Sequence, residues 1–415
     1  MNIYLRTFGC RANHYDSEAV RAMVEANGHA VVARAADADV AVFNSCAVTS
    51  EAEAELRKVV RRSARERVGL RSVVMGCAAA LDDARPASSR IASLPTVERV
   101  VPGADLDAIA GALGLEPRAL AARTVAQAGT RALLRVQDGC DEHCTFCATT
   151  LARGANRSRS IDELVREATL LAERHPEIVV TGIHIGTYGA DIGSSLGELM
   201  KRLVSNVPVV RFRLSSIEAT ELDERLVELL VGAPDRLAPH VHAPLQSGSD
   251  RVLKRMGRRW YTSASYAEAI ERLVGRMPVL GLGADVIAGF PGETDEDHAA
   301  TVRMIEELPF TYLHVFPYSA RPGTAAERLH EPVHAAQATK RAAELREAGR
   351  RKAASHVAAR TGGLADVVVI GGGTDRDGMT GDYLDVRIGD PSLARGDRFI
   401  GRLVADGAAL RAVGA

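Results

Sequence analysis

The sequence predicts an α/β protein built from three successive units. These are an N-terminal parallel sheet of βαβ elements, a central partial barrel of six βα units and a small C-terminal β-barrel. Two observations support this prediction. Short apolar runs alternate with segments whose apolar residues recur at helical spacing over most of the 415 residues. After about residue 360 that spacing stops, and β-like runs are separated by Gly- and Asp-rich turns. We place the units at residues 1–113, 126–356 and 358–415.

The N-terminal unit contains three predicted strands, each followed by a turn or a helix. Strands are expected at "NIYLRTFGC", "DVAVFNSC" and "SVVMGC", and helices at "DSEAVRAMVEANG" and "AEAELRKVVRRSARER". Asp16 or Ser17 is expected to cap the first helix and Gly28 to end it, because these residue types favour those positions. The alternation indicates a parallel sheet.

Three dispersed cysteines stand directly after these strands: Cys10, Cys46 and Cys77. In open parallel sheets, ligands bind beyond the carboxyl ends of the strands. Free cysteine is often only a small core residue, but three at equivalent positions favour one shared site. We therefore expect the three thiols to converge.

The central unit repeats the alternation six times. Its strands are predicted at "ALLRVQDG", "EIVVTGIHIG", "VVRFRLSS", "HVHAPLQ", "LGLGADVIAGF" and "YLHVFPYS". Amphipathic segments such as "SIDELVREATLLAERH" and "DEDHAATVRMIEEL" separate them. Such barrels carry their active sites at the C-terminal ends of the strands. A long helix is expected at 335–359, and the tail strands at "ADVVVI", "YLDVRI" and "RFIGRLVA".

Composition points to a cytoplasmic protein. Hydrophobic residues make up 46% of the chain and the formal net charge is -1. We find neither an apolar run long enough to span a membrane nor a signal peptide in "MNIYLRTFGC". Cytoplasmic cysteines more often bind metal or react than form disulfides. Basic runs at 57–67, 254–259 and 340–352 indicate either solvated helix faces or a polyanionic partner.

The motif "DGCDEHCTFC" places Cys140, Cys144 and Cys147 at C-x3-C-x2-C spacing and supplies no fourth cysteine. His143 could complete a zinc site, but zinc motifs normally separate their ligand pairs by a dozen residues or more. Closely spaced cysteines are typical of a cuboidal iron–sulfur cluster. With three thiolates for four irons, one iron stays open to a small molecule, as in a catalytic metal site.

This motif, after the first strand of a six-unit α/β domain, resembles the radical S-adenosylmethionine (SAM) superfamily. Phe146 fits the aromatic residue that is usual between its last two cysteines. "TFGCRANHYDSE", "FNSCAVTSEAE" and "VVMGCAA" look like the cysteine motifs of the methylthiotransferase N-terminal domain. "LQSGSDRVLKRM", "DVIAGFPGETDED" and "HVFPYSARPGTAA" look like signatures of the radical domain of that family, and the tail corresponds to its TRAM domain.

The resemblance implies two [4Fe-4S] clusters. The cluster on Cys140, Cys144 and Cys147 would bind SAM at its open iron and cleave it to a 5′-deoxyadenosyl radical. The cluster on the three dispersed cysteines would carry the sulfur or methylthio unit to be inserted. The family consumes two SAM molecules, one as methyl donor and one as radical source. It also needs a reducing electron donor such as flavodoxin or ferredoxin.

The substrate implied by the resemblance is the anticodon stem-loop of tRNA. "TGIHIGTYG", "RFRLSSIEATEL" and the "VTS" after Cys46 resemble the branch that modifies C2 of N6-threonylcarbamoyladenosine at adenosine 37. Other branches act on isopentenyladenosine or on an aspartate of a ribosomal protein. A non-catalytic iron–sulfur RNA-binding regulator is an alternative of another class, but it would need neither two incomplete clusters nor a barrel.

Six further residues are candidates for holding the cofactor or substrate, each with a structural alternative. They are Phe146, Gly182, His184, Arg213, Ser215 and Asp285. Arg213 and Ser215 share a strand face, and an inward Arg could bind the SAM carboxylate or a phosphate. Asp285 could hold ribose hydroxyls or cap a turn. His240 and His242 also share a face, with satisfied core histidines as the alternative.

Two departures from the family pattern concern the motif and the tail. Thr150 stands where proline is common, and we expect this to loosen the segment behind the cluster, although Arg153 and Gly154 are intact. The tail contains no Lys, and its seven Arg are outnumbered by eight Asp. We therefore expect the runs at 57–67 and 254–259 to carry more phosphate contacts than the tail.

Overall fold

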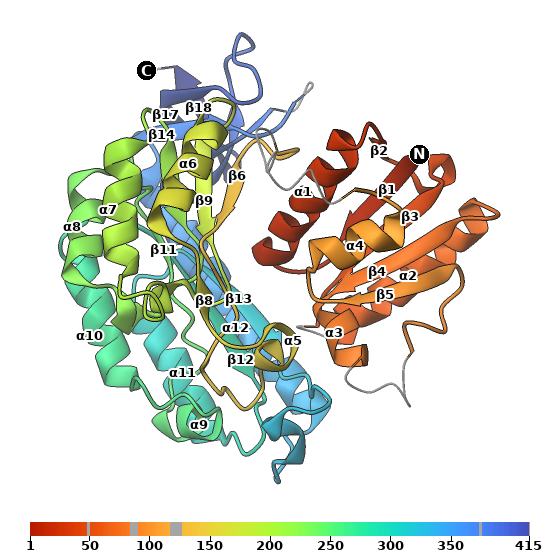
Figure 1. Cartoon of the computed structure of the whole chain (residues 1–415). Helices are drawn as coiled ribbons and strands as arrows, with labels where there is room; N and C mark the ends of the chain where they lie inside the picture. The colour runs from red at the N-terminus through yellow and green to blue at the C-terminus, as the bar shows by residue number, and fades with distance from the viewer. Residues whose placement is uncertain (48–49, 84–89, 117–126, 373–375, 415) are drawn as a thin grey trace.

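The structure is a computed structural model and describes residues 1–47, 50–83, 90–116, 127–372 and 376–414 (Figure 1). It confirms the α/β class: parallel sheets form the first two units, and a closed five-stranded barrel forms the third. In the described part of the chain, no helix combines the length and the apolar character that a membrane crossing requires.

The N-terminal unit is a five-stranded parallel sheet with helices on both faces. Its strand order is β2 (Ala30–Val32), β1 (Asn2–Thr7), β3 (Val40–Ser45), β4 (Arg71–Gly76) and β5 (Val97–Pro102). Its helices are α1 (Arg11–Ala26), α2 (Ser50–Glu66), α3 (Cys77–Asp83) and α4 (Leu106–Leu113). Alternation along β3 sends Val40 and Val42 to the core under α1 and α4, and Phe43 to the core under α2. The short edge strand β2 and the α4–β5 pair were not predicted.

Helix α1 starts earlier than the sequence prediction placed it. It begins at Arg11 with Cys10 as N-cap, and no side chain caps it. Asp16 and Ser17 lie buried inside the helix, where Asp16 pairs with arginines of the central unit and Ser17 accepts a hydrogen bond from Thr7. The capping prediction was therefore wrong, because tertiary partners satisfy these side chains. Gly28, with φ of +75°, follows the end of the helix as expected.

The six predicted central strands are all present as two parallel sheets. One sheet has the order β10 (Arg211–Leu214), β9 (Glu177–Thr181), β6 (Ala132–Arg135), and the other β11 (His240–His242), β12 (Gly281–Ala288), β13 (Tyr312–Pro317). Isolated bridges from Phe212 to Leu237 and from Ser216 to His242 join them. The result is the predicted partial barrel, whose hydrophobic core lies between the strands and their helices.

Helices cover the outside of this barrel (Figure 1). The long ones are α6 (Ile161–Ala172), α7 (Leu196–Asn206), α8 (Glu224–Gly232), α10 (Ser263–Val274) and α11 (Asp295–Glu307). Side chains of Ser160, Ser195, Asp223, Thr262 and Thr294 cap them. Two short helices, α5 (Thr149–Arg153) and α9 (Asp250–Arg255), were not predicted.

The tail follows helix α12 (Ala335–Arg360) and closes into a barrel in the order β14-β15-β16-β18-β17. Its strands are β14 (Leu364–Val369), β15 (Asp377–Thr380), β16 (Asp385–Ile388), β17 (Arg398–Asp406) and β18 (Ala409–Gly414). Strands β15 and β18 were not predicted, because glycines and single polar residues break their apolar pattern. Asp382 ties the tail to α12 through His356 and Arg360.

Candidate active site

Three adjacent strands bring the dispersed cysteines together. Cys10, Cys46 and Cys77 follow β1, β3 and β4, which are neighbours in the sheet. Asn13 Oδ1 lies 4.0 Å from the Cys10 sulfur and 3.7 Å from the Cys77 sulfur. At Gly9, with φ of +94°, a Cβ atom would lie 2.5 Å from the Cys46 sulfur, so only glycine fits there.

The second group of thiols lies on the loop after the first barrel strand. Gly139, with φ of +73°, leaves room for the carbonyl of Ala155, 1.9 Å from where a Cβ would stand. This close approach lets the Cys140 amide donate to the Gly154 carbonyl at 3.0 Å. The amides of Glu142 and Thr149 lie 3.4 Å from the sulfurs of Cys140 and Cys147. Amide hydrogen bonds to sulfur are typical of iron–sulfur ligands.

Two acid–base pairs flank this second group. Arg258 Nη1 lies 3.5 Å from the Cys144 sulfur, and the same guanidinium pairs with Glu218. His184 Nδ1 lies 3.7 Å from the Cys140 sulfur, and its Nε2 lies 2.9 Å from Glu221. Burial alone lowers the pKa of His184, but hydrogen bonds to Cys140 and Glu221 outweigh it and raise the pKa to about 10.

The two thiol groups fit a bound group larger than one metal ion. In the described chain, neither group brings three ligand atoms within 4.8 Å of one another, as one ion would require. His143, the alternative zinc ligand, is exposed. Burial raises the pKa of Cys77 to about 11 and that of Cys144 to about 12, so these thiols need a cationic partner to ionise at neutral pH. An iron–sulfur cluster supplies such a partner.

Arg153 joins the two thiol groups. It ends α5, six residues after Cys147, and its side chain crosses to the N-terminal unit. There Nε lies 3.3 Å from the Cys77 sulfur, and Nη2 donates to Asn13 and Asp16, both at 2.7 Å. Nη1 donates to Asp138 of the central unit at 3.0 Å.

A cavity of about 100 Å³ lies at the same junction. Cys77 from one group and Cys147 from the other both line it, together with Phe146, Ala47 and Arg321. Phe146 also packs edge-on against Phe290, with ring centroids 6.4 Å apart. The two cysteine sites therefore open on a common space.

Arg213 does not have the role considered for it, whereas close approach of a ligand to Gly182 stays a prediction. Arg213 is fully buried, and its guanidinium donates to Glu177 and to the carbonyls of Thr380 and Gly381, so it is committed to the contact with the tail. At Gly182 the close neighbour is Gln137, whose Oε1 lies 2.8 Å from where a Cβ would stand. That space is filled by protein.

Ser215 is buried, and its amide donates to the Val180 carbonyl. Asp285 lies between two histidines, His242 and His314, and is described below. The structure therefore places His184 and Phe146 beside the cysteines, and Asp285 on another part of the barrel.

The basic runs divide into exposed and buried cations. In the run 57–67, Arg61, Arg62 and Arg65 are exposed on α2. In the run 254–259, Lys254 and Arg259 are exposed, whereas Arg258 faces the cysteines. In the run 340–352, Arg341 is buried against Glu293. Only part of each run can meet an external polyanion.

Sequence reasoning missed the neighbours of the sulfurs. Arg258 was counted as part of a basic run, and Glu218 and Glu221 were not singled out. The glycine that precedes Arg258 is a signal that the sequence does show. In the structure Gly257 has φ of +78°, and a Cβ there would lie 2.8 Å from the His143 carbonyl. That glycine brings the two loops into contact.

Comparison with known proteins gives two family matches. Residues 134–305 match the radical SAM superfamily, and residues 2–94 match a family described as uncharacterized protein family UPF0004. Among solved structures, the chain resembles the radical S-adenosylmethionine methyltransferase TsrM from Kitasatospora setae, with a TM-score of 0.52 and 15% identity. The match covers 78% of this chain and 76% of that one. This likeness concerns the fold.

Curated relatives cover most of the chain. Threonylcarbamoyladenosine tRNA methylthiotransferase MtaB of Bacillus subtilis (strain 168) is 37% identical over 80% of this chain and 76% of its own length. MtaB of Aquifex aeolicus (strain VF5) is 30% identical over 97% of this chain and 99% of its own length. A tRNA-2-methylthio-N(6)-dimethylallyladenosine synthase of Sorangium cellulosum (strain So ce56) is 33% identical over 90% and 82%.

Proposed function

The chain belongs to the radical SAM methylthiotransferases, and we propose that its substrate is tRNA, modified at C2 of N6-threonylcarbamoyladenosine 37 beside the anticodon. One observation carries the proposal: one cysteine of each group, Cys77 and Cys147, lines a common cavity, and Arg153 joins the two groups. A chain that only bound RNA would not need this arrangement. The family implies SAM and a [4Fe-4S] cluster as cofactors.

We propose that each cysteine group holds one [4Fe-4S] cluster. Cys140, Cys144 and Cys147 would hold the cluster that binds SAM, and Cys10, Cys46 and Cys77 a second one that carries sulfur. When bound, the first cluster supplies the electron that cleaves SAM, which is the chemistry that activates a C–H bond. Three protein ligands on each cluster would leave one iron for SAM or for sulfur.

The protein's own residues orient these groups. Arg258, held by Glu218, and His184, held by Glu221, place positive hydrogen-bond donors beside the sulfurs of Cys144 and Cys140. Donors to sulfur make a cluster easier to reduce. Phe146 and its neighbours line a small, largely apolar space beside Cys147.

Arg153 fixes the distance between the two sites, because it contacts Cys77 and the loop that carries the other three cysteines. A transfer from one cluster to a carbon activated beside the other requires this distance to be constant. We expect exposed cations of the runs 57–67 and 254–259 to contact phosphates and a flavodoxin or ferredoxin to donate the electrons.

The threonylcarbamoyl branch is favoured by the MtaB relatives, which include the 37% match. The dimethylallyladenosine branch remains the second candidate, since a relative of that name is 33% identical over 90% of this chain. Nucleoside mass spectrometry of tRNA from a deletion strain separates them. Accumulation of unmodified threonylcarbamoyladenosine, reversed by the intact gene, supports the proposal. Accumulation of unmodified isopentenyladenosine supports the second candidate, and an unchanged profile of both contradicts a tRNA substrate.

A further inference from the structure

Strands β11, β12 and β13 present a polar row on the inner face of the barrel. Along β12 the side chains alternate. Leu282, Ala284 and Val286 belong to the hydrophobic core, so Gly283 and Asp285 face the other way. In register, Gly283 pairs with His242 on β11 and Asp285 pairs with His314 on β13. His242, Asp285 and His314 therefore share the inner face, away from the core.

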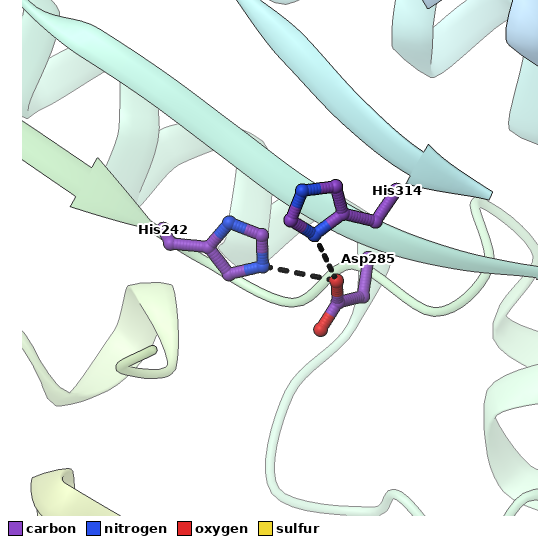
Figure 2. A group of neighbouring side chains, drawn as sticks. All are labelled: His242, Asp285 and His314. Carbon is purple, nitrogen blue, oxygen red and sulfur yellow. Dashed lines mark hydrogen bonds and ion pairs between the residues drawn. The ribbon is translucent and has the colours of Figure 1, made fainter. Parts of the chain in front are cut away.

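The two histidine side chains both point at one carboxylate oxygen of Asp285 (Figure 2). Asp285 Oδ1 lies 3.1 Å from His242 Nε2 and 3.2 Å from His314 Nδ1, and all three ligand atoms lie within 4.8 Å of one another. Burial alone raises the pKa of Asp285, but hydrogen bonds from the two histidines hold it well below its usual range. The carboxylate is therefore ionised at neutral pH. The His314 side chain is 53% exposed, which leaves one side of the group accessible.

A second layer of residues orients His242. Its Nδ1 lies 3.0 Å from Tyr312 Oη, which also lies 2.8 Å from His240 Nε2. The tyrosine ring can lie there because β12 has Gly283 opposite it; a Cβ on that residue would stand 2.0 Å from the ring. In metal sites a hydrogen bond at one ring nitrogen of a histidine orients the other nitrogen toward the ion.

We propose that His242, Asp285 and His314 bind one divalent first-row transition metal ion. With metal–ligand bonds of about 2.1 Å, the two separations of 3.1 and 3.2 Å subtend about 95–99° at the ion. Both angles lie between those of octahedral and tetrahedral coordination, the two geometries that such ions commonly adopt. Two neutral imidazoles and one carboxylate form the ligand set that divalent iron and its neighbours take in facial triads with open positions.

The ion would be distinct from both cysteine sites. None of its three ligands is a cysteine, and they come from strands β11, β12 and β13, whereas Cys140, Cys144 and Cys147 follow the first barrel strand. Its open coordination positions would lie on the accessible side, beside His314, and would offer a Lewis acid to an oxygen donor within the barrel. The alternative is that the three side chains only hydrogen-bond to one another and stabilise the fold. Metal content distinguishes the two cases.

The test uses the full chain with its clusters reconstituted anaerobically, so that the thiols are occupied. The protein is incubated with Zn²⁺, passed over a desalting column, and analysed for zinc and iron by mass spectrometry. We compare Asp285→Asn, which keeps the shape but removes the charge, and His314→Ala. The matched control is His298→Ala, since His298 also pairs with a carboxylate, Glu344 at 2.9 Å, without a second histidine.

We expect about one Zn²⁺ per chain in the unaltered protein and the control, and a zinc content at least about tenfold lower in both triad variants with unchanged iron. Zinc content that is equal in all four proteins, or absent from all, overturns the proposal. If a triad variant loses iron as well as zinc, zinc content no longer separates the two cases, and the visible absorption spectrum after addition of Co²⁺ is compared instead. A new visible band that Asp285→Asn lacks supports the site, and its absence in the unaltered protein contradicts it.

Discussion

Replacing Arg153 with methionine should destabilise the contact between the N-terminal and central units. The Arg153 side chain is 3% exposed, and its guanidinium donates to Asn13, Asp16 and Asp138. Removing one partner of a buried ion pair typically costs about 3–5 kcal/mol. Two facts reduce that figure here, since Asp16 keeps its pair with Arg135, and Asp138 is 21% exposed. We therefore expect a loss of about 2–3 kcal/mol.

The assay is urea unfolding of the cluster-free protein, followed by far-UV circular dichroism. Arg157→Met is the matched control. Arg157 contacts the same Asp138, at 3.8 Å, but its side chain is 58% exposed, so we expect a change within about 0.5 kcal/mol. The N-terminal unit of the Arg153 variant should unfold at lower urea than the central unit. A loss below about 0.5 kcal/mol for Arg153→Met would refute the reasoning that the guanidinium joins the two units.

Three further predictions concern the cysteines, a glycine and a buried carboxylate. Changing the three cysteines of 140–147 to alanine should leave about half of roughly eight irons and abolish SAM cleavage; full retention of cleavage contradicts the assignment. Gly283→Ala should lower stability by about 1–3 kcal/mol, because its Cβ would meet a tyrosine ring at 2.0 Å. Gly372→Ala is the matched control: its Cβ would lie in open space, so its stability in urea unfolding should be unchanged. Burial alone raises the pKa of Asp382, but its partners His356 and Arg360 outweigh burial and lower the pKa to about 2. A lowered pKa stabilises the fold above the unfolded value, so about 2.5 kcal/mol should be lost in all as the pH falls to 1, of which about 1.8 kcal/mol is lost between pH 4 and pH 2. In urea melts of cluster-free protein, Asp382→Asn should differ from the unaltered chain at pH 7 and converge with it near pH 2; a pH-independent difference contradicts this.

Local patterns in the sequence predicted most of the fold and the place of the cysteines. Apolar alternation locates strands such as β3, and parallel strands end at one edge, so Cys46 and its two counterparts had to lie near one another. The motif at 140–147 is local as well. Such features depend on spacing within about ten residues, which a single sequence displays directly.

Features that depend on distant partners could not be predicted in this way. Asp16 resembles a helix cap, but its partner Arg153 lies 137 residues away. Arg213 resembles an anion-binding residue on an inner barrel face, yet Glu177 neutralises it and the tail accepts its remaining hydrogen bonds. Alternation placed Arg213 and Ser215 on one face of their strand but did not show that Arg213 pairs with Glu177.

That pairing is part of the contact between the tail and the central barrel. Arg211 and Glu177 begin their barrel strands, and Arg213 lies two residues further along β10. Both arginines pair with the fully buried Glu177 and donate to backbone carbonyls of the tail. The arginines of the tail also spend hydrogen bonds on protein groups: Arg360, Arg376, Arg387, Arg395, Arg398, Arg402 and Arg411. The tail therefore covers one end of the central barrel. Because the strands are parallel, the cysteines of 140–147 follow the opposite end, which leaves that end for substrate.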